Sequence, residues 1–356
     1  MVNFRSGLFF VVALALAIVI GGAAVEVRAA EPKRQLNLFI WSEYIDPEII
    51  SNFEKAYNVK VRLDYYESNE EMIAKLQSGQ VGAYDLIVPS TYFIPILVNL
   101  NLIQPLNHTL LTNIGNIKQE FTELLVDVGN KFSIPYQWGT SGLVARSKAE
   151  DEVEQSWKLL FENKNPANFL LFDTARDALG SALKFLGFSA NTIDLQEIQA
   201  AGQLLIETKK KPTFMGFDSG VGGLAKVVGQ VASIAQVYSG EAIRASREEE
   251  NIVYVIPQEG CEQWLDVLAI PKGAPHAAVA HEFLNYILEP KVAAKLASFN
   301  NYATPNEKAM EFISDEDKND PGMYPPESLK QKMEYFKDLG SNFRLYEETW
   351  TLVKAR

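Results

Sequence analysis

The sequence holds little cysteine and histidine, and this scarcity limits the chemistry that it can support. Cys261 is the single cysteine, so the chain can form no internal disulfide and no zinc site built on cysteine pairs. Histidine occurs at His108, His276 and His281. The spacing of His276 and His281 does not place them on one stripe of a helix, and both are expected at the surface or at a rim. We therefore predict no metal site, and we interpret Cys261 as a packed structural residue.

The common enzyme motifs are also missing. There is no Gly-x-Ser-x-Gly nucleophile elbow and no His-Glu-x-x-His metal motif. The glycines of Ser219–Gly223 lack the Lys-Ser/Thr that completes a phosphate-binding loop, so they are better interpreted as the start of a helix. No nucleophile stands beside a base in any motif. We expect no catalytic residue, no cofactor and no enzyme activity.

Clusters of basic residues are absent, and acidic residues outnumber basic ones. The chain has 45 Asp and Glu against 33 Lys and Arg, which gives a formal net charge of −12. Nucleic-acid affinity depends mainly on clustered Lys and Arg that neutralise phosphates, so we expect no nucleic-acid partner. The charge favours a cationic partner, although acidity can also serve solubility alone.

Long apolar runs are missing except at the N-terminus. After Arg5, an apolar run extends from Gly7 to Val25 and is followed by Ala29-Ala30, a pattern typical of a secretory signal peptide. We predict a signal peptide over residues 1–30; an uncleaved anchor is the alternative, since about twenty apolar residues can span a bilayer. The leader has no cysteine to carry a lipid. A periplasmic location is therefore expected.

The rest of the chain is rich enough in apolar residues for two lobes. Of its 356 residues, 47% are hydrophobic and 22% are charged, which is typical of a globular protein. The part after the leader is too long for one small core. No Pro/Gly/Ser linker separates two halves. This indicates that the chain crosses between the lobes more than once.

Strand and helix patterns alternate after the leader. Apolar or alternating runs predict strands at 35–41, 59–65 and 84–89. Two helix starts lie between these strands, at Asp46-Pro47 and at the capping box Ser68–Glu71. Strands that alternate with helices through short links imply right-handed crossovers and a parallel sheet covered by helices.

A second α/β alternation follows. The same patterns predict further strands at 142–146, 169–173, 233–238 and 252–257 and helices at 175–186 and 195–209. The run Trp264–Ile270 is predicted to lead back into the first lobe. A helix is predicted at 276–288, and the tail 328–354 is mostly helical in pattern.

Aromatic and acidic residues gather where the predicted strands end, and ligands of such sheets bind beyond those ends. The exits of the first three strands read Trp41-Ser42-Glu43-Tyr44, Tyr65-Tyr66-Glu67 and Ser90-Thr91-Tyr92. Rings adjoin acids again at Tyr238 and Glu241 and at Trp264 and Asp266. An alkyl diamine is an apolar rod with an ammonium at each end, so it needs aromatic walls and terminal carboxylates. Alternatively, the rings are core and the acids are solvated.

From about Leu36 onward the chain resembles the bacterial spermidine/putrescine-binding periplasmic proteins, the receptor subunits of polyamine ABC importers. The resemblance is carried by residues 41–44, 66–70, 82–86, 88–92, 133–136, 138–139, 264–266 and 301–306. It implies a two-lobed periplasmic-binding-protein (type II) α/β fold, each lobe a mainly parallel sheet flanked by helices, which closes on a polyamine in the interlobe cleft. It also implies a monomer that delivers its ligand to a membrane permease. We place lobe 1 at 31–139 plus 265–310, and lobe 2 at 140–264 plus 311–356.

The resemblance also assigns roles to residues. It implies an aromatic box formed by Trp41, Tyr44, Tyr92, Tyr238, Trp264 and Tyr302. Polar contacts near one end of the ligand are expected from Ser42, Glu43 and Ser90. Asp266 matches the principal carboxylate for an ammonium group, and Asp177 matches a second acidic position.

Departures from the family pattern concern the choice of polyamine. Thr174 stands where the spermidine-preferring pattern has an acid, and Phe336 stands where it has Gln. Glu241 falls where putrescine-preferring relatives carry an acid. Tyr238 replaces the usual Trp, which is the better cation–π partner. The pattern therefore favours putrescine over spermidine.

Other solutes and roles remain alternatives. The same fold could hold an amino acid, or a ferric ion bound by Tyr65 and Tyr66. Neighbouring residues of one strand point to opposite faces, and an iron site needs further ligands, so the iron alternative is weaker. A polyamine sensor would use the same clamp as an importer subunit.

Overall fold

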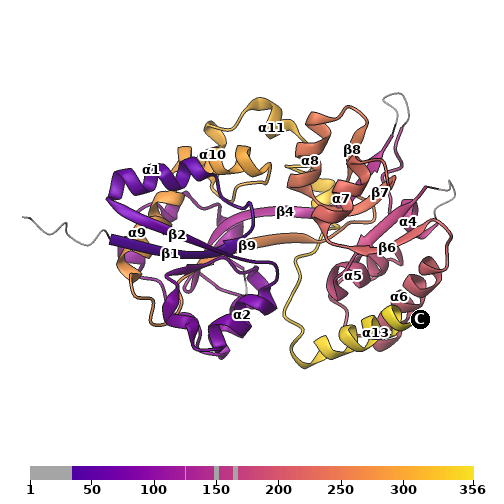
Figure 1. The fold of residues 1–356 in the computed structure, drawn as a ribbon, viewed down its shortest axis with the longest axis horizontal. Coiled ribbons are helices and arrows are strands. Elements are labelled where there is room, and N and C mark those ends of the chain that lie inside the picture. Colours follow the sequence, from indigo (N-terminus) through magenta and orange to yellow (C-terminus); the bar gives the residue numbers. More distant parts are fainter. Residues whose placement is uncertain (1–33, 125, 148–151, 163–166) are drawn as a thin grey trace, which may run out of the picture. The chain divides into compact units, whose positions relative to one another are not determined.

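Three parallel strands form the sheet of the first lobe, as predicted (Figure 1). β1 (Arg34–Trp41) lies between β2 (Val59–Tyr66) and β3 (Leu86–Ile87) and is parallel to both. The connecting helices are α1 (Pro47–Tyr57) and α2 (Asn69–Gln77). Asp46 and Ser68 cap them, because their side chains accept the backbone N–H groups of Glu48 and Glu71. Each cap satisfies a donor that the first helical turn leaves free.

The computed structural model describes residues 34–124, 126–147, 152–162 and 167–356. Residues 34–356 form one unit, which is described by itself. The signal peptide predicted over residues 1–30 lies outside the described residues. Within the described part, no helix is both long and apolar enough to cross a membrane.

Two strands pass from one lobe to the other. β4 (Ser133–Arg146) is a single strand of 14 residues, of which the sequence patterns predicted only the end at 142–146. β9 (Gln263–Ala269) is antiparallel to both β4 and β3. The sheet order is β2-β1-β3-β9-β4-β7-β5-β6, with β8 also paired to β4. The predicted return of the chain at 264–270 is therefore confirmed.

The second lobe repeats the parallel arrangement. β5 (Phe169–Phe172) is parallel to β6 (Phe214–Asp218) and β7 (Ile234–Tyr238), whereas β8 (Ile252–Val255) is antiparallel to β4. Its helices are α4 (Lys158–Phe161), α5 (Ala175–Phe185), α6 (Leu195–Lys209), α7 (Gly220–Val228), α8 (Ser239–Glu248) and α13 (Phe343–Ala355). Ser219 caps α7 by accepting the N–H of Gly222, which confirms the helix start predicted at these glycines.

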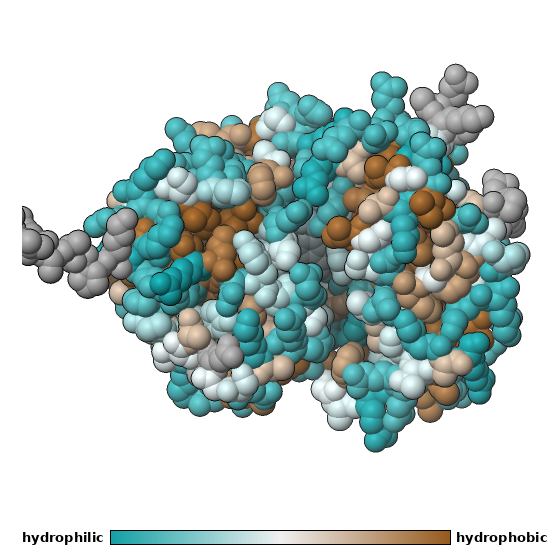
Figure 2. Space-filling view, in the orientation of Figure 1, coloured by the Kyte–Doolittle hydropathy of each residue, from teal (hydrophilic) through white to brown (hydrophobic). Residues whose placement is uncertain are grey.

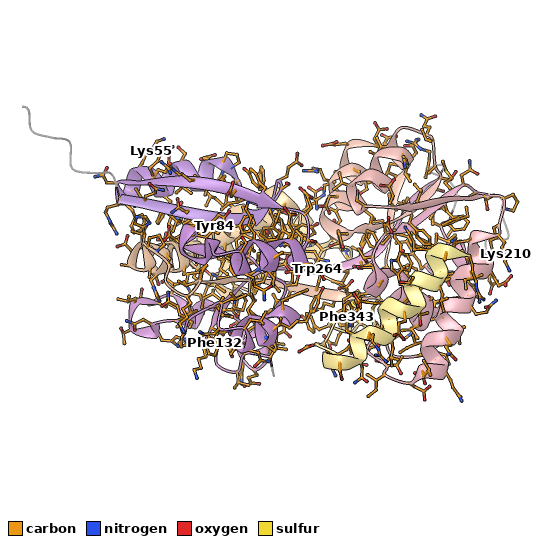
Figure 3. All side chains as sticks on the ribbon, turned by 60° about the horizontal axis from the view of Figure 1, so that its bottom comes forward. Lys55, Tyr84, Phe132, Lys210, Trp264 and Phe343 are labelled. Atoms are coloured by element: carbon orange, nitrogen blue, oxygen red, sulfur yellow. The ribbon has the colours of Figure 1, made fainter. Side chains whose placement is uncertain are left out.

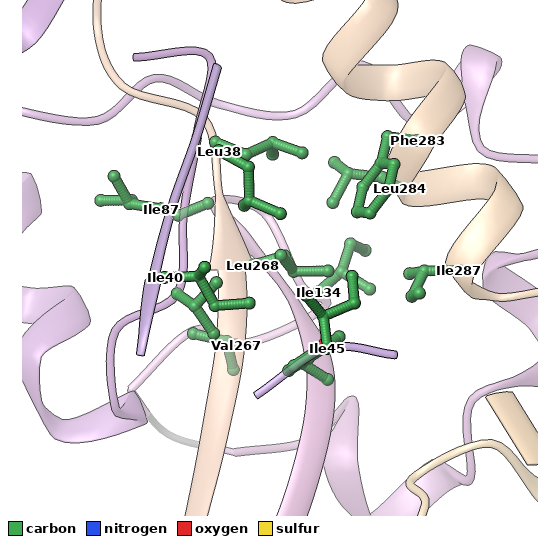
Figure 4. Close-up of a cluster of buried hydrophobic side chains, with 14 of the residues drawn as sticks. Leu38, Ile40, Ile45, Ile87, Ile134, Val267, Leu268, Phe283, Leu284 and Ile287 are labelled. Atoms are coloured by element: carbon green, nitrogen blue, oxygen red, sulfur yellow. The ribbon is translucent and has the colours of Figure 1, made fainter. Parts of the chain in front are cut away.

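The remaining α-helices connect or cover the two sheets. They are α3 (Ile94–Asn99), α9 (Ala277–Ile287), α10 (Pro290–Asn300), α11 (Asp315–Asn319) and α12 (Glu327–Lys330). α9 packs against β1, so it covers the first sheet as the apolar spacing of 276–288 predicted. Figure 4 shows this contact, with Phe283 and Leu284 of α9 beside Leu38 and Leu268 of the sheet.

Each lobe has its own buried core. The first core contains residues of β1, β3, β9 and α9, among them Leu38, Ile87, Leu268 and Leu284. It also includes Ile313 and Met323, which come from the segment 311–356 that we placed in lobe 2. The second core centres on residues of β4, β5, α5, α6 and α13, among them Leu143, Phe169, Leu179, Leu205 and Tyr346. The lobe boundaries stay predictions, whereas the two-lobed α/β fold is confirmed by the structural comparisons reported below.

One expectation outside the site was wrong, whereas another is confirmed. The tail 328–354 is mostly helical as predicted, with α12, a 3₁₀ helix at Gly340–Asn342 and α13. Between α12 and the 3₁₀ helix, Glu334 pairs with strand backbone: its N–H donates to the carbonyl of Cys261 and its carbonyl accepts from Gln263. His281 is buried rather than exposed, because its Nε2 accepts the backbone N–H of Asn107 at 2.9 Å. Cys261 is buried as predicted, and this burial raises the pKa of its thiol.

Candidate functional site

Asp266 lies at the centre of the candidate site, on the crossing strand β9. The hydroxyl of Ser90 donates to its Oδ1 at 2.7 Å, and the hydroxyl of Tyr44 donates to its Oδ2 at 2.9 Å. Ser90 follows β3 and Tyr44 follows β1, so two strand exits and β9 meet here. Burial raises the pKa of Asp266 to about 6, although both hydrogen bonds oppose the rise. None of the described Lys, Arg or His side chains forms an ion pair with this carboxylate.

Four rings of the predicted aromatic box form a continuous edge-to-face row beside Asp266. Ring centroids lie 5.8 Å apart between Tyr44 and Tyr302, 4.7 Å between Tyr302 and Trp264, and 6.2 Å between Trp264 and Tyr238. Each pair meets at 69° or more, the arrangement that the quadrupoles of aromatic rings favour. The row therefore presents an apolar wall with ring faces and edges next to a carboxylate.

Gly139 of β4 makes room for Trp264. A Cβ at this position would lie 2.5 Å from Cζ2 of the indole, closer than real atoms approach. Because Trp264 pairs with Gly139 across β4 and β9, the indole lies flat against the neighbouring strand. The glycine thus fixes where the central ring of the row can lie. Figure 3 shows Trp264 where the two lobes join.

Glu241 supplies a second carboxylate from the other lobe. It lies in the first turn of α8, where the helix dipole favours a negative charge. The hydroxyl of Tyr302 donates to its Oε2, so this hydrogen bond links the row of rings to α8. Burial raises the pKa of Glu241, while the bond from Tyr302 and the charge of Arg244 lower it.

Asp177 faces a small cavity on the side of the second lobe. It lies in the first turn of α5 and accepts a hydrogen bond from the hydroxyl of Thr174, the N-cap of that helix. The cavity holds about 10 Å³ of free space. Its lining includes Ser141, Asp177, Gly180, Gln236, Glu262 and Phe336. This space has room for about one water molecule.

Tyr92 and Phe336 close the site between the two lobes. Their rings meet edge to face, with centroids 6.1 Å apart. Phe336 also contacts Arg176, whose guanidinium carbon lies 4.2 Å from the centroid of the phenyl ring. Phe336 was predicted to replace a Gln of the spermidine-preferring pattern, and this correspondence stays a prediction. Figure 2 shows the surface hollowed between the two lobes.

The arrangement suits capture of a small cation. The carboxylates of Asp266 and Glu241 lie beside the row of four rings. One elongated ligand can therefore contact both carboxylates and the rings. No group of three or more metal-ligating side chains occurs in the described ranges. A model of the bacterial extracellular solute-binding protein family matches residues 48–325.

The chain belongs to this family.

Curated relatives of this solute-binding protein agree with the resemblance seen in the sequence. The spermidine/putrescine-binding periplasmic protein of Salmonella typhimurium is 35% identical over 94% of this chain and 96% of its own length. A putrescine-binding periplasmic protein of Pseudomonas aeruginosa is 31% identical over 96% of this chain and 97% of its own length. The predicted resemblance to spermidine/putrescine-binding periplasmic proteins is confirmed.

Solved structures support the two-lobed fold. A putative spermidine/putrescine ABC transporter protein from Listeria monocytogenes superimposes with a TM-score of 0.82 at 34% identity. The superposition covers 90% of this chain and 99% of that chain. A spermidine/putrescine ABC transporter substrate-binding protein from Streptococcus pneumoniae gives a TM-score of 0.80 at 31% identity and the same coverage of this chain. The predicted periplasmic-binding-protein fold is therefore confirmed.

Three other predicted site residues of this solute-binding protein lie where β1 ends. The indole N–H of Trp41 donates to the carbonyl of Val88 at 2.8 Å. The hydroxyl of Ser42 donates to Glu67 at 2.8 Å. The side chain of Glu43 is 84% exposed. Their predicted contacts with ligand stay predictions. The structure brings together Tyr44, Ser90, Tyr238, Glu241, Trp264, Asp266 and Tyr302. Tyr92, which follows β3 of the first lobe, contacts Phe336, and Asp177 lies in the second lobe.

Glu262 is a member of the site that the sequence patterns missed. The hydroxyl of Ser141 donates to its Oε2 at 2.9 Å, and its carboxyl lies beside that of Asp177. Burial and the neighbouring Asp177 raise the pKa of Glu262 well above its usual range. The signal was present in the sequence, because alternate residues of a strand share a face and Glu262 is two before Trp264 and four before Asp266.

Proposed function

We propose that this solute-binding protein captures a polyamine between its lobes in the periplasm and delivers it to the permease of an ABC importer. Putrescine is favoured over spermidine, and the protein acts as a monomer without catalysis. The buried carboxylate of Asp266 carries the proposal, since it is held by two hydroxyls and lies beside a row of rings with no basic partner from the described residues. The names of the relatives support a polyamine as the ligand.

The contacts suggest how a diamine would lie. One ammonium binds Asp266, where Tyr44 and Ser90 fix the carboxylate and leave it ready to accept. The methylenes lie along Trp264 and Tyr302, and each ring face near an ammonium contributes about 0.5 to 2 kcal/mol. The second ammonium binds Glu241. Because Glu241 and Asp266 come from segments that we assign to different lobes, a ligand that touches both would favour the closed form.

A thermal-shift screen of the purified protein tests the proposal. The ligand must first be removed by unfolding and refolding. Putrescine, cadaverine, spermidine and spermine are then compared with neutral and acidic amino acids and with ferric ion. A polyamine should raise the midpoint of unfolding, and more so at higher concentration relative to its dissociation constant, because it binds only the folded protein. Stabilisation by an amino acid or by iron, with none from any polyamine, would overturn the assignment.

Replacing Glu241 by Ser should reduce the preference for putrescine. The substitution removes the carboxylate proposed for one ammonium, so the dissociation constant for putrescine should rise about 10-fold. The affinity for spermidine should fall less, so the dissociation constants of the two ligands should become more similar. Glu248→Ser is the matched control, because Glu248 is an exposed residue at the other end of α8. Equal ratios in wild type and Glu241→Ser, measured by titration calorimetry, would remove Glu241 from the site.

A further inference from the structure

Three charged groups face one another where β1 ends. Arg244 follows Glu241 by one turn of α8, and its Nη2 lies 4.0 Å from Oε2 of Glu43. Glu43 is held there by a left-handed backbone, with φ of 54°, which directs the chain sharply away from β1. The charges of Arg244 and Glu43 both act on the carboxyl of Glu241, in opposite directions. One cation therefore already acts on two carboxylates at this end of the site.

The opposite end of the site is balanced by a different arginine. Arg176 is buried, and its guanidinium donates to Asn191 at 2.8 Å and to the carbonyl of Lys337 at 3.1 Å. Its charge acts on both Asp177 and Glu262. Burial and the adjacent Asp177 raise the pKa of Glu262 well above its usual range, because two carboxyl groups side by side disfavour a second negative charge. The positive charge of Arg176 offsets the negative charge that this pair carries.

The charges that remain match a ligand with two positive charges. Asp266 contributes one negative charge once an ammonium lies beside it. Glu43, Glu241 and Arg244 together contribute one more. We infer that Arg244 is a built-in cation of the binding site, which leaves two negative charges there and so selects a diamine over a triamine. The inference rests on the proposed function and names a residue that sets its specificity.

A third ammonium has no free carboxylate in this arrangement. Near the end of β1 it would compete with Arg244 for Glu43 and Glu241, and like charges at such distances repel. At the other end, the cavity beside Asp177 has about 10 Å³ of free space, too little for an aminopropyl arm without rearrangement. Because Arg244 is 47% exposed, solvent screens its charge and the expected discrimination is modest.

Neutralising Arg244 tests the inference. In Arg244→Gln, the ratio of the dissociation constants of spermidine and putrescine should fall about 2- to 5-fold relative to wild type. Arg244→Lys, which keeps the charge, should retain the wild-type ratio. Arg244→Met keeps an unbranched side chain and serves as the second neutral variant if Arg244→Gln does not fold. The constants are measured by titration calorimetry in low salt, where exposed charges act most strongly.

A double variant separates charge balance from a simple interlobe latch. Glu43→Gln combined with Arg244→Gln restores the net charge of this end, so the ratio should return to that of wild type. A latch broken by one substitution would stay broken in the double variant. Arg247→Gln is the control, because it removes the same charge from α8 but from ion pairs with Asp317 and Asp320.

The possible results are distinct. A ratio that falls in Arg244→Gln and recovers in the double variant supports the inference. An unchanged ratio in the neutral variants, an equal fall in Arg247→Gln, or a double variant that behaves like Arg244→Gln overturns it and leaves the proposed function standing. If wild type binds neither putrescine nor spermidine, the inference and the proposed function both fail.

Discussion

Replacing Asp266 by Asn is expected to weaken putrescine binding on the order of 100-fold, the largest effect predicted for a single side chain of this protein. The carboxylate is buried and meets its ligand without competition from water, so loss of its charge leaves an ammonium desolvated and unpaired. Asn keeps the size of the side chain, and the hydroxyls of Ser90 and Tyr44 can turn to meet its amide.

Titration calorimetry with putrescine measures this loss. Asp315→Asn is the matched control, because Asp315 is 94% exposed and its ion pair lies on the short helix α11. The control should bind as wild type does. If Asp266→Asn folded normally and bound putrescine with wild-type affinity, Asp266 would not be the ammonium partner.

The same substitution should stabilise the ligand-free protein at neutral pH. The pKa of Asp266 is about 6 in the folded protein, against an ordinary value of 3.8. Between these values the folded protein binds more protons at this site than the unfolded chain, so stability falls as the pH rises through that window. Above pH 6 the full cost is about 3 kcal/mol, since each pKa unit corresponds to about 1.4 kcal/mol. Asn carries no charge at any of these pH values and avoids the cost.

Urea unfolding of both proteins without ligand tests this effect. Near neutral pH, Asp266→Asn should exceed wild type by about 3 kcal/mol in the free energy of unfolding. Below pH 4 wild-type Asp266 is protonated in both states, and the two proteins should be nearly equal. A difference that did not depend on pH would assign the effect to packing instead. Saturating putrescine should reverse the order at neutral pH, because only wild type binds it tightly.

Together, these two results would show that Asp266 lowers the stability of the ligand-free protein and strengthens ligand binding. A buried carboxylate between Tyr44 and Ser90 is unfavourable until a cation arrives, and the arriving ammonium receives an ionised, oriented partner. The raised pKa of Glu241 shows the same feature at the second carboxylate. The burial of the Asp266 and Glu241 carboxylates therefore prepares both contacts that the proposed diamine would use.

Local signals in the sequence predicted the elements that depend on neighbouring residues. The caps Asp46 and Ser68 and the start of α7 at Ser219 occur as expected, because each satisfies free backbone donors within one turn. The full length of β4 was not predictable in this way. Its first half contains Pro135 and Gly139, which weaken a strand pattern, and distant pairing with β9 holds it extended.

The position of a site residue was predictable from the sequence where a regular strand carries it. It was less predictable where the direction of a side chain depends on an irregular backbone. Trp264 and Asp266 share a face of β9, and the same alternation continued one residue before the strand would have revealed Glu262. Glu43 has a positive φ, and its exposed carboxylate lies 4.0 Å from the guanidinium of Arg244. No periodic pattern announces a left-handed residue when it is not glycine. The pairing of Glu43 with Arg244 could be found only in the folded chain.

The most direct test of the account is calorimetric titration of putrescine into the purified protein after its endogenous ligand has been removed. The account predicts saturable binding of one putrescine per chain, with spermidine weaker, and with binding that weakens as the pH falls below the pKa of Asp266, about 6. Absence of saturable binding by putrescine and by spermidine would contradict the assignment of the cleft to polyamines.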